Sequence, residues 1–186
     1  MSTGKQAFDS PAPPCQIGPM PPVIREARPG DIPQLNAIYG HYVETCTCTW
    51  EESDKELFSR ETLARRGPRH PLLVVEDNGR LLAWGSLSPY NTRSGWRHVA
   101  EDSIFLHPDA RGKGLGKLLL GELVARARAI GFRKLLARIS GDQPASLGLH
   151  RALGFSEAGR LRGAGEKQGK RLDAVYLELD LEPPQP

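Results

Sequence analysis

The spacing of apolar residues along the chain predicts an alternation of helices and strands. In two segments, 32–42 and 115–129, apolar side chains recur every three or four positions, which places them on one face of an amphipathic helix. A capping-box pattern at Ser53 and Glu56 predicts a further helix that stops near Gly67. A shorter helix is predicted at about 144–153, before Gly154.

Seven shorter segments have the character of β-strands. The strongest signal is Asn78-Gly79, because both positions of this dipeptide tolerate positive φ in a tight hairpin turn. The predicted strands are 23–27, 72–76, 81–87, 98–106, 134–139, 156–162 and 172–181. The glycine-rich link 163–169 is predicted to be a mobile loop. This order indicates an α/β (α+β) fold in which about four helices flank a mixed, mostly antiparallel sheet of six to seven strands.

Length and composition point to one globular domain. With 186 residues the chain is long enough for one core and too short for two ordinary domains. We expect the domain at 23–182, a disordered proline-rich tail at 1–22 and a short tail at 183–186. The net charge of +3 is spread along the chain, which gives no support to nucleic-acid binding. No segment has the apolar character of a signal peptide or a membrane span, so no membrane partner is expected.

The cysteines favour a reducing compartment, and we expect a cytoplasmic location. Neither the cysteines nor the histidines indicate a metal site. Cys46 and Cys48 form a single C-x-C pair, and no second pair completes a zinc site. We interpret both as thiols without a catalytic role. The five histidines lack the H-E-x-x-H spacing, so no metal-dependent chemistry is predicted.

The strongest chemical signal is the segment Arg111-Gly112-Lys113-Gly114-Leu115-Gly116, which lies between an apolar strand and an amphipathic helix. The first N–H groups of a helix have no partner within it, and the helix dipole there favours an anion. Glycine lets the backbone approach that anion because no Cβ intervenes. A helix start that binds nothing is the alternative, but alternating glycines would then weaken the turn for no structural benefit. We therefore predict a diphosphate site.

Two familiar phosphate-binding motifs do not fit these residues. A Walker A loop requires glycine where Arg111 stands and a hydroxyl residue where Leu118 stands. A dinucleotide fingerprint requires glycine at Lys117, and a parallel strand order that the predicted hairpin contradicts.

Arg111, Gly114 and Gly116 match the hallmark of the GNAT acetyltransferases, which is Arg or Gln, two residues, Gly, one residue, then Gly or Ala. The chain resembles this superfamily over about 23–182, and within it the phosphinothricin or methionine sulfoximine acetyltransferases. The matching segments are 42–45, 100–108, 149–155 and 169–173. The resemblance implies the GNAT fold and an enzyme that transfers acetyl from acetyl-CoA to an amine by direct attack in a ternary complex.

The resemblance also implies how acetyl-CoA, as cosubstrate, is bound without a metal. In such enzymes one strand pairs through its backbone with the pantetheine arm, and the glycine-rich segment holds the pyrophosphate. A splay between that strand and the next leaves a slot for the thioester. The implied cofactor-binding residues are Ile104, Phe105, Leu106, Arg111, Gly112, Lys113, Gly114, Leu115, Gly116, Lys117, Gln143 and Ser146. Gln143 stands where the family often has asparagine.

Two residues are predicted to move protons. An amine is mostly ammonium at neutral pH, so a base must free its lone pair. The resemblance places a glutamate base at Glu101, acting directly or through water, whereas on spacing alone Asp102 is equally suited and either is equally a solvated carboxylate. His150 stands where many GNAT enzymes carry a tyrosine near the sulfur, and we predict that it donates a proton to the departing thiolate. Without the family, a packing role would be favoured for His150.

The resemblance implies a small, anionic, amino-acid-like substrate whose primary amine is acetylated. It puts an anion-binding arginine at Arg93, where a guanidinium can hold a carboxylate or phosphinate by two parallel hydrogen bonds. The other predicted substrate-binding residues are Tyr90, Trp96 and Ser103. Two alternatives stay open: a GNAT enzyme for protein N-termini, polyamines or antibiotic amines, and a non-catalytic acetyl-CoA sensor. Relatives of this kind are commonly dimers, so the resemblance also allows a homodimer.

Overall fold

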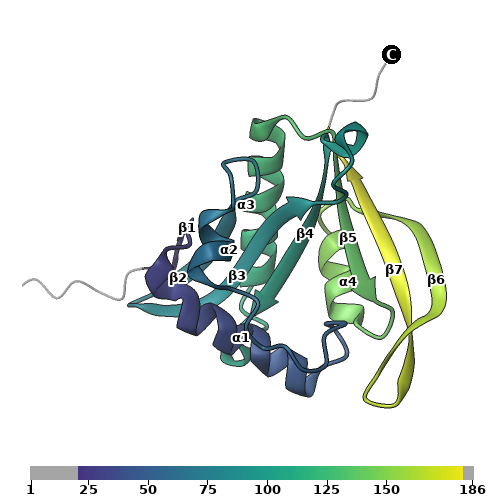
Figure 1. Ribbon diagram of the computed structural model, residues 1–186, viewed down its shortest axis with the longest axis horizontal. Coiled ribbons are helices and arrows are strands. Elements are labelled where there is room, and N and C mark those ends of the chain that lie inside the picture. The colour runs from purple at the N-terminus through teal and green to yellow at the C-terminus, as the bar shows by residue number, and fades with distance from the viewer. Residues whose placement is uncertain (1–20, 182–186) are drawn as a thin grey trace, which may run out of the picture.

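Seven strands and four α-helices make up residues 21–181, the part of the chain that the computed structural model describes (Figure 1). The strands are β1 (Val23–Glu26), β2 (Leu72–Asp77), β3 (Arg80–Pro89), β4 (Val99–Leu106), β5 (Lys134–Ser140), β6 (Ser156–Lys167) and β7 (Lys170–Asp180). The helices are α1 (Ile32–Thr45), α2 (Arg60–Ala64), α3 (Leu115–Ile130) and α4 (Pro144–Arg151). Residues 1–20 of the predicted N-terminal tail and the predicted tail at 183–186 lie outside the described part. Within that part, no helix combines the length and apolar character needed to cross a bilayer.

The strands form one sheet whose two halves separate in the middle. Their order is β1-β2-β3-β4-β5-β7-β6, and every neighbouring pair is antiparallel except β4 and β5. The predicted mixed, mostly antiparallel sheet is thereby confirmed. β4 pairs with β5 only through 99–101 and 134–136. Beyond that point β4 stays paired to β3 as far as Leu106, and β5 to β7 as far as Ser140, so the two facing backbone edges are open toward each other.

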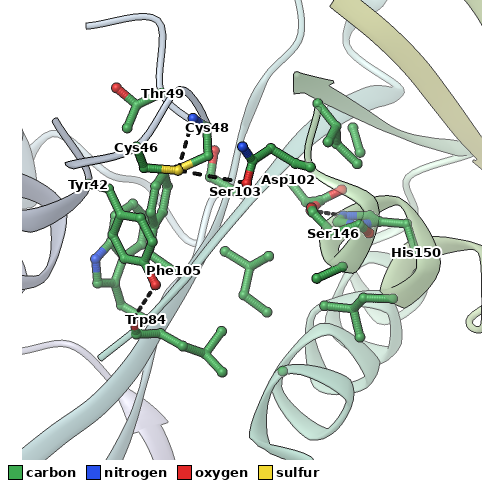
Figure 2. Close-up of a pocket in the computed structure, with 18 of the residues that line it drawn as sticks. Tyr42, Cys46, Cys48, Thr49, Trp84, Asp102, Ser103, Phe105, Ser146 and His150 are labelled. Carbon is green, nitrogen blue, oxygen red and sulfur yellow. Dashed lines mark hydrogen bonds and ion pairs between the residues drawn. A yellow bond between two sulfur atoms is a disulfide. The ribbon is translucent and has the colours of Figure 1, made fainter. Parts of the chain in front are cut away.

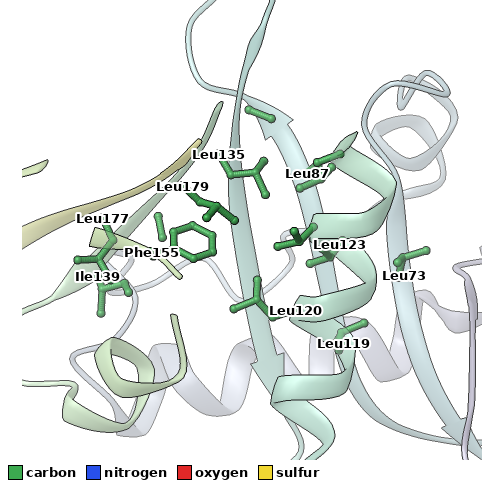
Figure 3. Close-up of a cluster of buried hydrophobic side chains, with 14 of the residues drawn as sticks. Leu73, Leu87, Leu119, Leu120, Leu123, Leu135, Ile139, Phe155, Leu177 and Leu179 are labelled. Carbon is green, nitrogen blue, oxygen red and sulfur yellow. The ribbon is translucent and has the colours of Figure 1, made fainter. Parts of the chain in front are cut away.

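Helices cover both faces of the sheet because its strands alternate apolar side chains between the faces. In β2, Leu73 and Val75 join a cluster formed with α3 and α4, whereas Leu72 and Val74 pack beneath α1. Figure 3 shows the larger cluster around α3, to which the helix contributes its fully buried leucines, Leu119, Leu120 and Leu123. Burying each of these side chains stabilises the fold by roughly 1.5–3 kcal/mol.

The close approach of α3 to the sheet depends on a glycine in β3. A Cβ on Gly85 would lie 2.8 Å from the Cδ1 atom of Leu123. Because this contact is too short for a real side chain, glycine at this position lets α3 lie directly on the strand. The helix is thereby fixed with its N-terminus beside the opening between β4 and β5.

The C-terminal hairpin is longer than the sequence predicted. The expected loop at 163–169 is wrong, because β6 continues to Lys167 and turns through Gln168 and Gly169, whose φ angles are 53° and 71°, directly into β7. Trp50 lies against Gly165 so closely that a Cβ there would meet its ring at 2.1 Å. Glycine at 165 therefore accommodates a side chain from a distant segment, and local glycine content could not reveal this contact.

The second helix also starts later than predicted. α2 begins at Arg60, and its cap is Ser59, whose Oγ accepts the N–H of Thr62 at 3.1 Å. The predicted cap at Ser53 is instead held in a turn, because its N–H donates to Oε1 of Glu51 at 3.0 Å. The cap formed by Ser59 and Thr62 does not match the Ser-x-x-Glu pattern, so the sequence analysis did not select it.

Candidate active site

A cavity of about 820 Å³ lies where β4 and β5 separate. Its walls come from the end of α1 with the loop that follows, from β4 and β5, from the first turn of α3, and from α4. Figure 2 shows Tyr42 and the Cys46–Cys48 pair on one side of the cavity, and Ser146 and His150 of α4 on the other. A cavity of this size and composition is typical of a small-molecule site.

The entrance of α3, where the sequence predicts an anion site, opens into this cavity. Gly112 and Gly114 have φ angles of 73° and 76°, and Gly114 is the N-cap of the helix. A Cβ at either glycine would meet nothing within 4 Å, so it is the left-handed backbone rather than crowding that requires glycine. The first turn of α3 carries no acidic residue, which leaves its positive end uncompensated.

Most residues of the predicted diphosphate segment face the cavity. Those that line it are Arg111, Gly112, Gly114, Gly116 and Lys117. Lys113 is exposed and is not among the lining residues, and Leu115 is 8% exposed in the core. The structure therefore brings together five of the seven residues predicted around the pyrophosphate.

The end of β4 is held by a network from α1. Arg111 donates from Nε to the hydroxyl of Tyr42 at 3.2 Å, and this hydroxyl donates to the carbonyl of Leu106 at 2.5 Å. Ile104, Phe105 and Leu106 all line the cavity, as predicted for the strand that meets the pantetheine arm. The network fixes the end of the open edge of β4 relative to the α3 entrance.

Glu101 places a half-buried carboxylate at the inner end of the cavity. Its side chain is 20% exposed, and the Nη2 atom of Arg138 on β5 lies 3.4 Å from its Oε1. Burial raises the pKa of Glu101, and the charge of Asp102 adds to that rise, whereas the charge of Arg138 opposes it. A carboxylate whose pKa is raised by burial is suited to accept a proton from an ammonium group.

His150 and Asp102 form a second titratable pair in the cavity wall. The Nε2 atom of His150 lies 3.0 Å from Oδ2 of Asp102, and the two side chains are 2% and 1% exposed. Sequence spacing left Asp102 and Glu101 equivalent, but the structure gives them different partners. Asp102 contacts His150, and Glu101 contacts Arg138.

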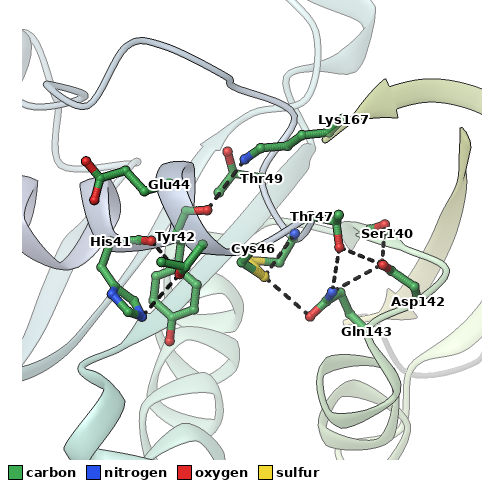
Figure 4. The surroundings of a disulfide bond; sticks show 12 residues. His41, Tyr42, Glu44, Cys46, Thr47, Thr49, Ser140, Asp142, Gln143 and Lys167 are labelled. Atoms are coloured by element: carbon green, nitrogen blue, oxygen red, sulfur yellow. Dashed lines mark hydrogen bonds between the residues drawn. A yellow bond between two sulfur atoms is a disulfide. The ribbon is translucent and has the colours of Figure 1, made fainter. Parts of the chain in front are cut away.

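Gln143 lines the cavity and is hydrogen-bonded to the loop after α1 (Figure 4). Its Nε2 donates to Thr47 Oγ1 at 3.1 Å and to Asp142 Oδ1 at 3.1 Å. The structure places the sulfur atoms of Cys46 and Cys48, which the sequence analysis interpreted as thiols, next to each other. The chain turns directly after α1, which brings the two Cα atoms to 5.3 Å from each other, beside Gln143.

Comparison with known proteins agrees with this geometry. Residues 35–155 match the model of the acetyltransferase (GNAT) family. This chain belongs to the GNAT family. It is therefore an acetyl-CoA-dependent N-acetyltransferase.

The chain is similar to characterised acetyltransferases over most of its length. It is 39% identical to the L-methionine sulfoximine/L-methionine sulfone acetyltransferase of Pseudomonas aeruginosa, covering 86% of this chain and 95% of the relative. It is 39% identical to the phosphinothricin N-acetyltransferase of Alcaligenes faecalis, covering 85% and 82%. A similar solved structure is the crystal structure of the phosphinothricin acetyltransferase of Sinorhizobium meliloti in complex with AcCoA. The two chains have 36% sequence identity and a TM-score of 0.81, and the match covers 87% of this chain and 89% of that one.

Three of the predicted substrate-binding residues of this GNAT enzyme lie outside the cavity wall. Arg93 and Trp96 are exposed and Tyr90 is half-buried in the connection between β3 and β4, where the rings of Tyr90 and Trp96 contact each other at 5.1 Å. They are not among the lining residues, whereas Ser103 and Ser146 are. The role of Arg93 stays a prediction.

The cavity also contains polar side chains that the sequence analysis did not select. Arg138 and Trp50 both line it, and the Nε1 atom of Trp50 is buried without a hydrogen-bond partner in the described part of the chain. A cation in the middle of the mostly apolar strand 134–139 was the available signal for Arg138. For Trp50 no local signal existed, because its position depends on packing against β6. Among residues 21–181 no cluster of three or more His, Cys, Asp or Glu side chains is placed to bind a metal ion.

Proposed function

We propose that this enzyme acetylates the primary amine of a small, anionic, amino-acid-like substrate of the phosphinothricin or methionine sulfoximine type. The observation that carries the proposal is that one cavity contains a helix entrance for the diphosphate, an open strand edge, the buried carboxylate of Glu101 and the cation of Arg138. The names of the relatives support the same class of substrate.

In this proposal acetyl-CoA lies in the opening between β4 and β5. The N–H groups at the start of α3, with Arg111 and Lys117, neutralise its pyrophosphate. The unpaired backbone edge of β4 binds the pantetheine arm, and Gln143 and Ser146 line its far side. The acetyl thioester then reaches the inner end of the opening, close to Glu101.

Glu101 is the proposed base in the reaction. It accepts a proton from the substrate ammonium group, directly or through water, so that the nitrogen lone pair can attack the thioester carbon. The bond from that carbon to sulfur breaks, the nitrogen loses its second proton to solvent, and the thiolate leaves beside His150. No covalent enzyme intermediate is needed in this sequence of events.

Recognition of the anionic group is proposed for two arginine side chains. Arg93 is the sequence-based choice, and Arg138 is already at the cavity wall beside Glu101. A carboxylate held by a guanidinium would place the α-amine of the same substrate near Glu101. We further propose a cytoplasmic enzyme that acts as a homodimer.

A thiol-release assay with acetyl-CoA tests the proposed substrate class. The amines compared are methionine sulfoximine, phosphinothricin, a polyamine and a peptide with a free N-terminus. We expect turnover with the two anionic amino acids. We expect Arg93→Ala to raise KM for them by roughly 10- to 100-fold, because a charged hydrogen-bonding group contributes about 1.5–3 kcal/mol.

The matched control is Arg97→Ala in the same connection, because Arg97 binds the carbonyl of Ser94 at 3.3 Å and is not part of the cavity. We expect an unchanged KM for this variant. Turnover confined to the polyamine or the peptide would reject the proposed substrate class. Binding of acetyl-CoA without turnover on any amine would favour the sensor.

A further inference from the structure

Asp102 and His150 form a buried pair that links the two sides of the cavity. Asp102 comes from β4 and His150 from the last turn of α4, 48 positions away in the sequence. Their side chains are 1% and 2% exposed, and both residues line the cavity. The rings of His150 and the core residue Phe155 meet edge to face, with their centres 5.1 Å apart.

Both ring nitrogens of His150 face hydrogen-bond acceptors. Nδ1 lies 2.8 Å from the backbone carbonyl of Ser146, which can only accept, so Nδ1 must carry a hydrogen. Nε2 lies 3.0 Å from Oδ2 of Asp102. Two arrangements satisfy both contacts: an imidazolium beside a carboxylate, or a neutral imidazole beside a protonated Asp102.

The surroundings favour the imidazolium. Although burial by itself lowers the pKa of His150, the hydrogen bond and charge of Asp102, together with the carbonyl of Ser146, outweigh it and raise the pKa. His150 also lies in the last turn of α4, where the negative end of the helix dipole stabilises a cation. The adjacent charged residues are engaged elsewhere, since Glu101 contacts Arg138 and Arg151 contacts Glu157.

Asp102 directs its hydrogen bonding to this one partner. Its Oδ1 atom is buried and has no hydrogen-bond partner within residues 21–181. A buried carboxylate oxygen without a donor is unfavourable and is rarely kept unless the position has a further role. The orientation and charge of the carboxylate therefore act mainly on Nε2 of His150.

We propose that Asp102 is a positioning residue for acetyl transfer, which holds His150 as an imidazolium with a fixed ring orientation beside the cavity. This role rests on the proposed function, because the positive ring then faces the thiolate that leaves acetyl-CoA. When the carbon–sulfur bond breaks, the electron pair goes to sulfur. The positive charge of the ring, whose two N–H groups stay bonded to Ser146 and Asp102, stabilises the thiolate, which then takes a proton from solvent.

Nitrogen NMR of the histidine side chains tests the charge of the pair without any turnover. In the full-length wild-type protein we expect both nitrogens of His150 to be protonated at pH 7.5, above the ordinary histidine pKa of about 6.5. In Asp102→Asn we expect the midpoint of the His150 titration to fall by one pH unit or more. A wild-type ring protonated only on Nδ1 at this pH, or an unchanged midpoint in the variant, would overturn the proposal.

Kinetics test whether the pair serves the reaction. We expect Asp102→Asn to lower kcat by roughly 10- to 100-fold, to move the alkaline limb of the kcat profile to lower pH, and to leave KM for acetyl-CoA within about twofold. The control is Asp180→Asn, because Asp180 is an exposed carboxylate paired with Lys134. This variant should keep the wild-type pH profile.

The two measurements separate the two proposals. An unchanged pH profile in Asp102→Asn rejects the positioning role. An enzyme that acetylates no amine rejects the proposed function, while the nitrogen spectra still decide the charge of His150. If the variant does not fold, the wild-type spectra alone decide that charge.

Discussion

Glu101 and Asp102 are neighbours in the sequence but meet different surroundings in the fold. Successive side chains of a strand point to opposite faces, so two adjacent carboxylates in β4 cannot share one environment. Glu101 contacts an arginine at the open inner end of the cavity, and Asp102 is enclosed against the imidazole of His150. The choice between them as base follows from this difference, which sequence spacing alone could not supply.

Replacing Arg138 tests Glu101 as the base at the level of one residue. The charge of Arg138 lowers the pKa of Glu101 against the effect of burial. In Arg138→Gln that pKa should therefore rise, and the acidic limb of the kcat/KM profile should move to higher pH, because a base must be ionised to accept a proton. Rates across a pH series in constant ionic strength check this.

Arg126→Gln is the matched control for that experiment. Arg126 lies on α3 and pairs with Glu122 outside the cavity, so its loss should leave the acidic limb in place. If the acidic limb does not move in Arg138→Gln, the ionisation that governs the rate is not that of Glu101.

At the scale of the element, α3 contributes both to the hydrophobic core and to the wall of the cavity. Its buried leucines face the sheet along its length, and its first turn opens into the cavity through glycines with left-handed backbone. The amphipathic spacing of apolar residues predicted the helix, and the glycines at its start predicted that it binds a diphosphate. The extension of β6 beyond Arg162 was missed because the packing of Gly165 against Trp50 is not a local property.

The entrance of α3 can be tested with two glycines of the same segment. Gly114→Ala must place a side chain at a φ of 76°, which costs about 1–2 kcal/mol. We expect roughly 5- to 30-fold weaker binding of coenzyme A by titration calorimetry, because the strained turn no longer directs its N–H groups at the pyrophosphate.

Gly121→Ala in the middle of α3 is the control for this substitution. Its Cβ would meet nothing within 4 Å, and its φ is not positive, so the helix should gain up to about 1 kcal/mol in urea unfolding with unchanged affinity. Equal affinity in Gly114→Ala and wild type would remove the α3 entrance from the binding site.

At the scale of the whole molecule, one ion-pair network connects the first strand, the first helix and the sheet. Arg25 of β1 donates two hydrogen bonds to Asp31, at 2.7 and 2.9 Å, and one to Glu76 of β2 at 2.6 Å. Asp31 is 8% exposed and also accepts the N–H of Arg28 at 2.7 Å. This arrangement fixes where α1 begins, and hence where its C-terminal end meets the cavity.

The hydrogen bonds from Arg25 are the largest influence on Asp31 and hold its pKa below the ordinary value of 3.8, against the opposing effect of burial. The stabilisation is therefore present above pH 3.8 and is lost as pH falls through the lowered pKa. We expect Asp31→Asn to reduce the free energy of unfolding by about 2 kcal/mol at pH 7, with a difference from wild type that shrinks below pH 3.8.

Urea unfolding across pH 2–7 measures this difference. The control is Asp54→Asn, an exposed carboxylate in the loop before α2, for which a change below about 0.5 kcal/mol is expected. A constant difference between Asp31→Asn and wild type at all pH values would show that the ionised form of Asp31 is not what stabilises the fold.

The sequence by itself determined the features that depend on near neighbours in the chain. Hydrophobic period predicted the helices and strands, Asn78-Gly79 predicted the first hairpin, and the alternating glycines predicted the anion site at α3. Only the tertiary structure decided which groups meet across the molecule: Asp102 with His150, Glu101 with Arg138, and Trp50 with Gly165. The physical reason is that burial, hydrogen-bond partners and the charge of a side chain depend on what the fold places beside it, and these contacts join residues tens of positions apart.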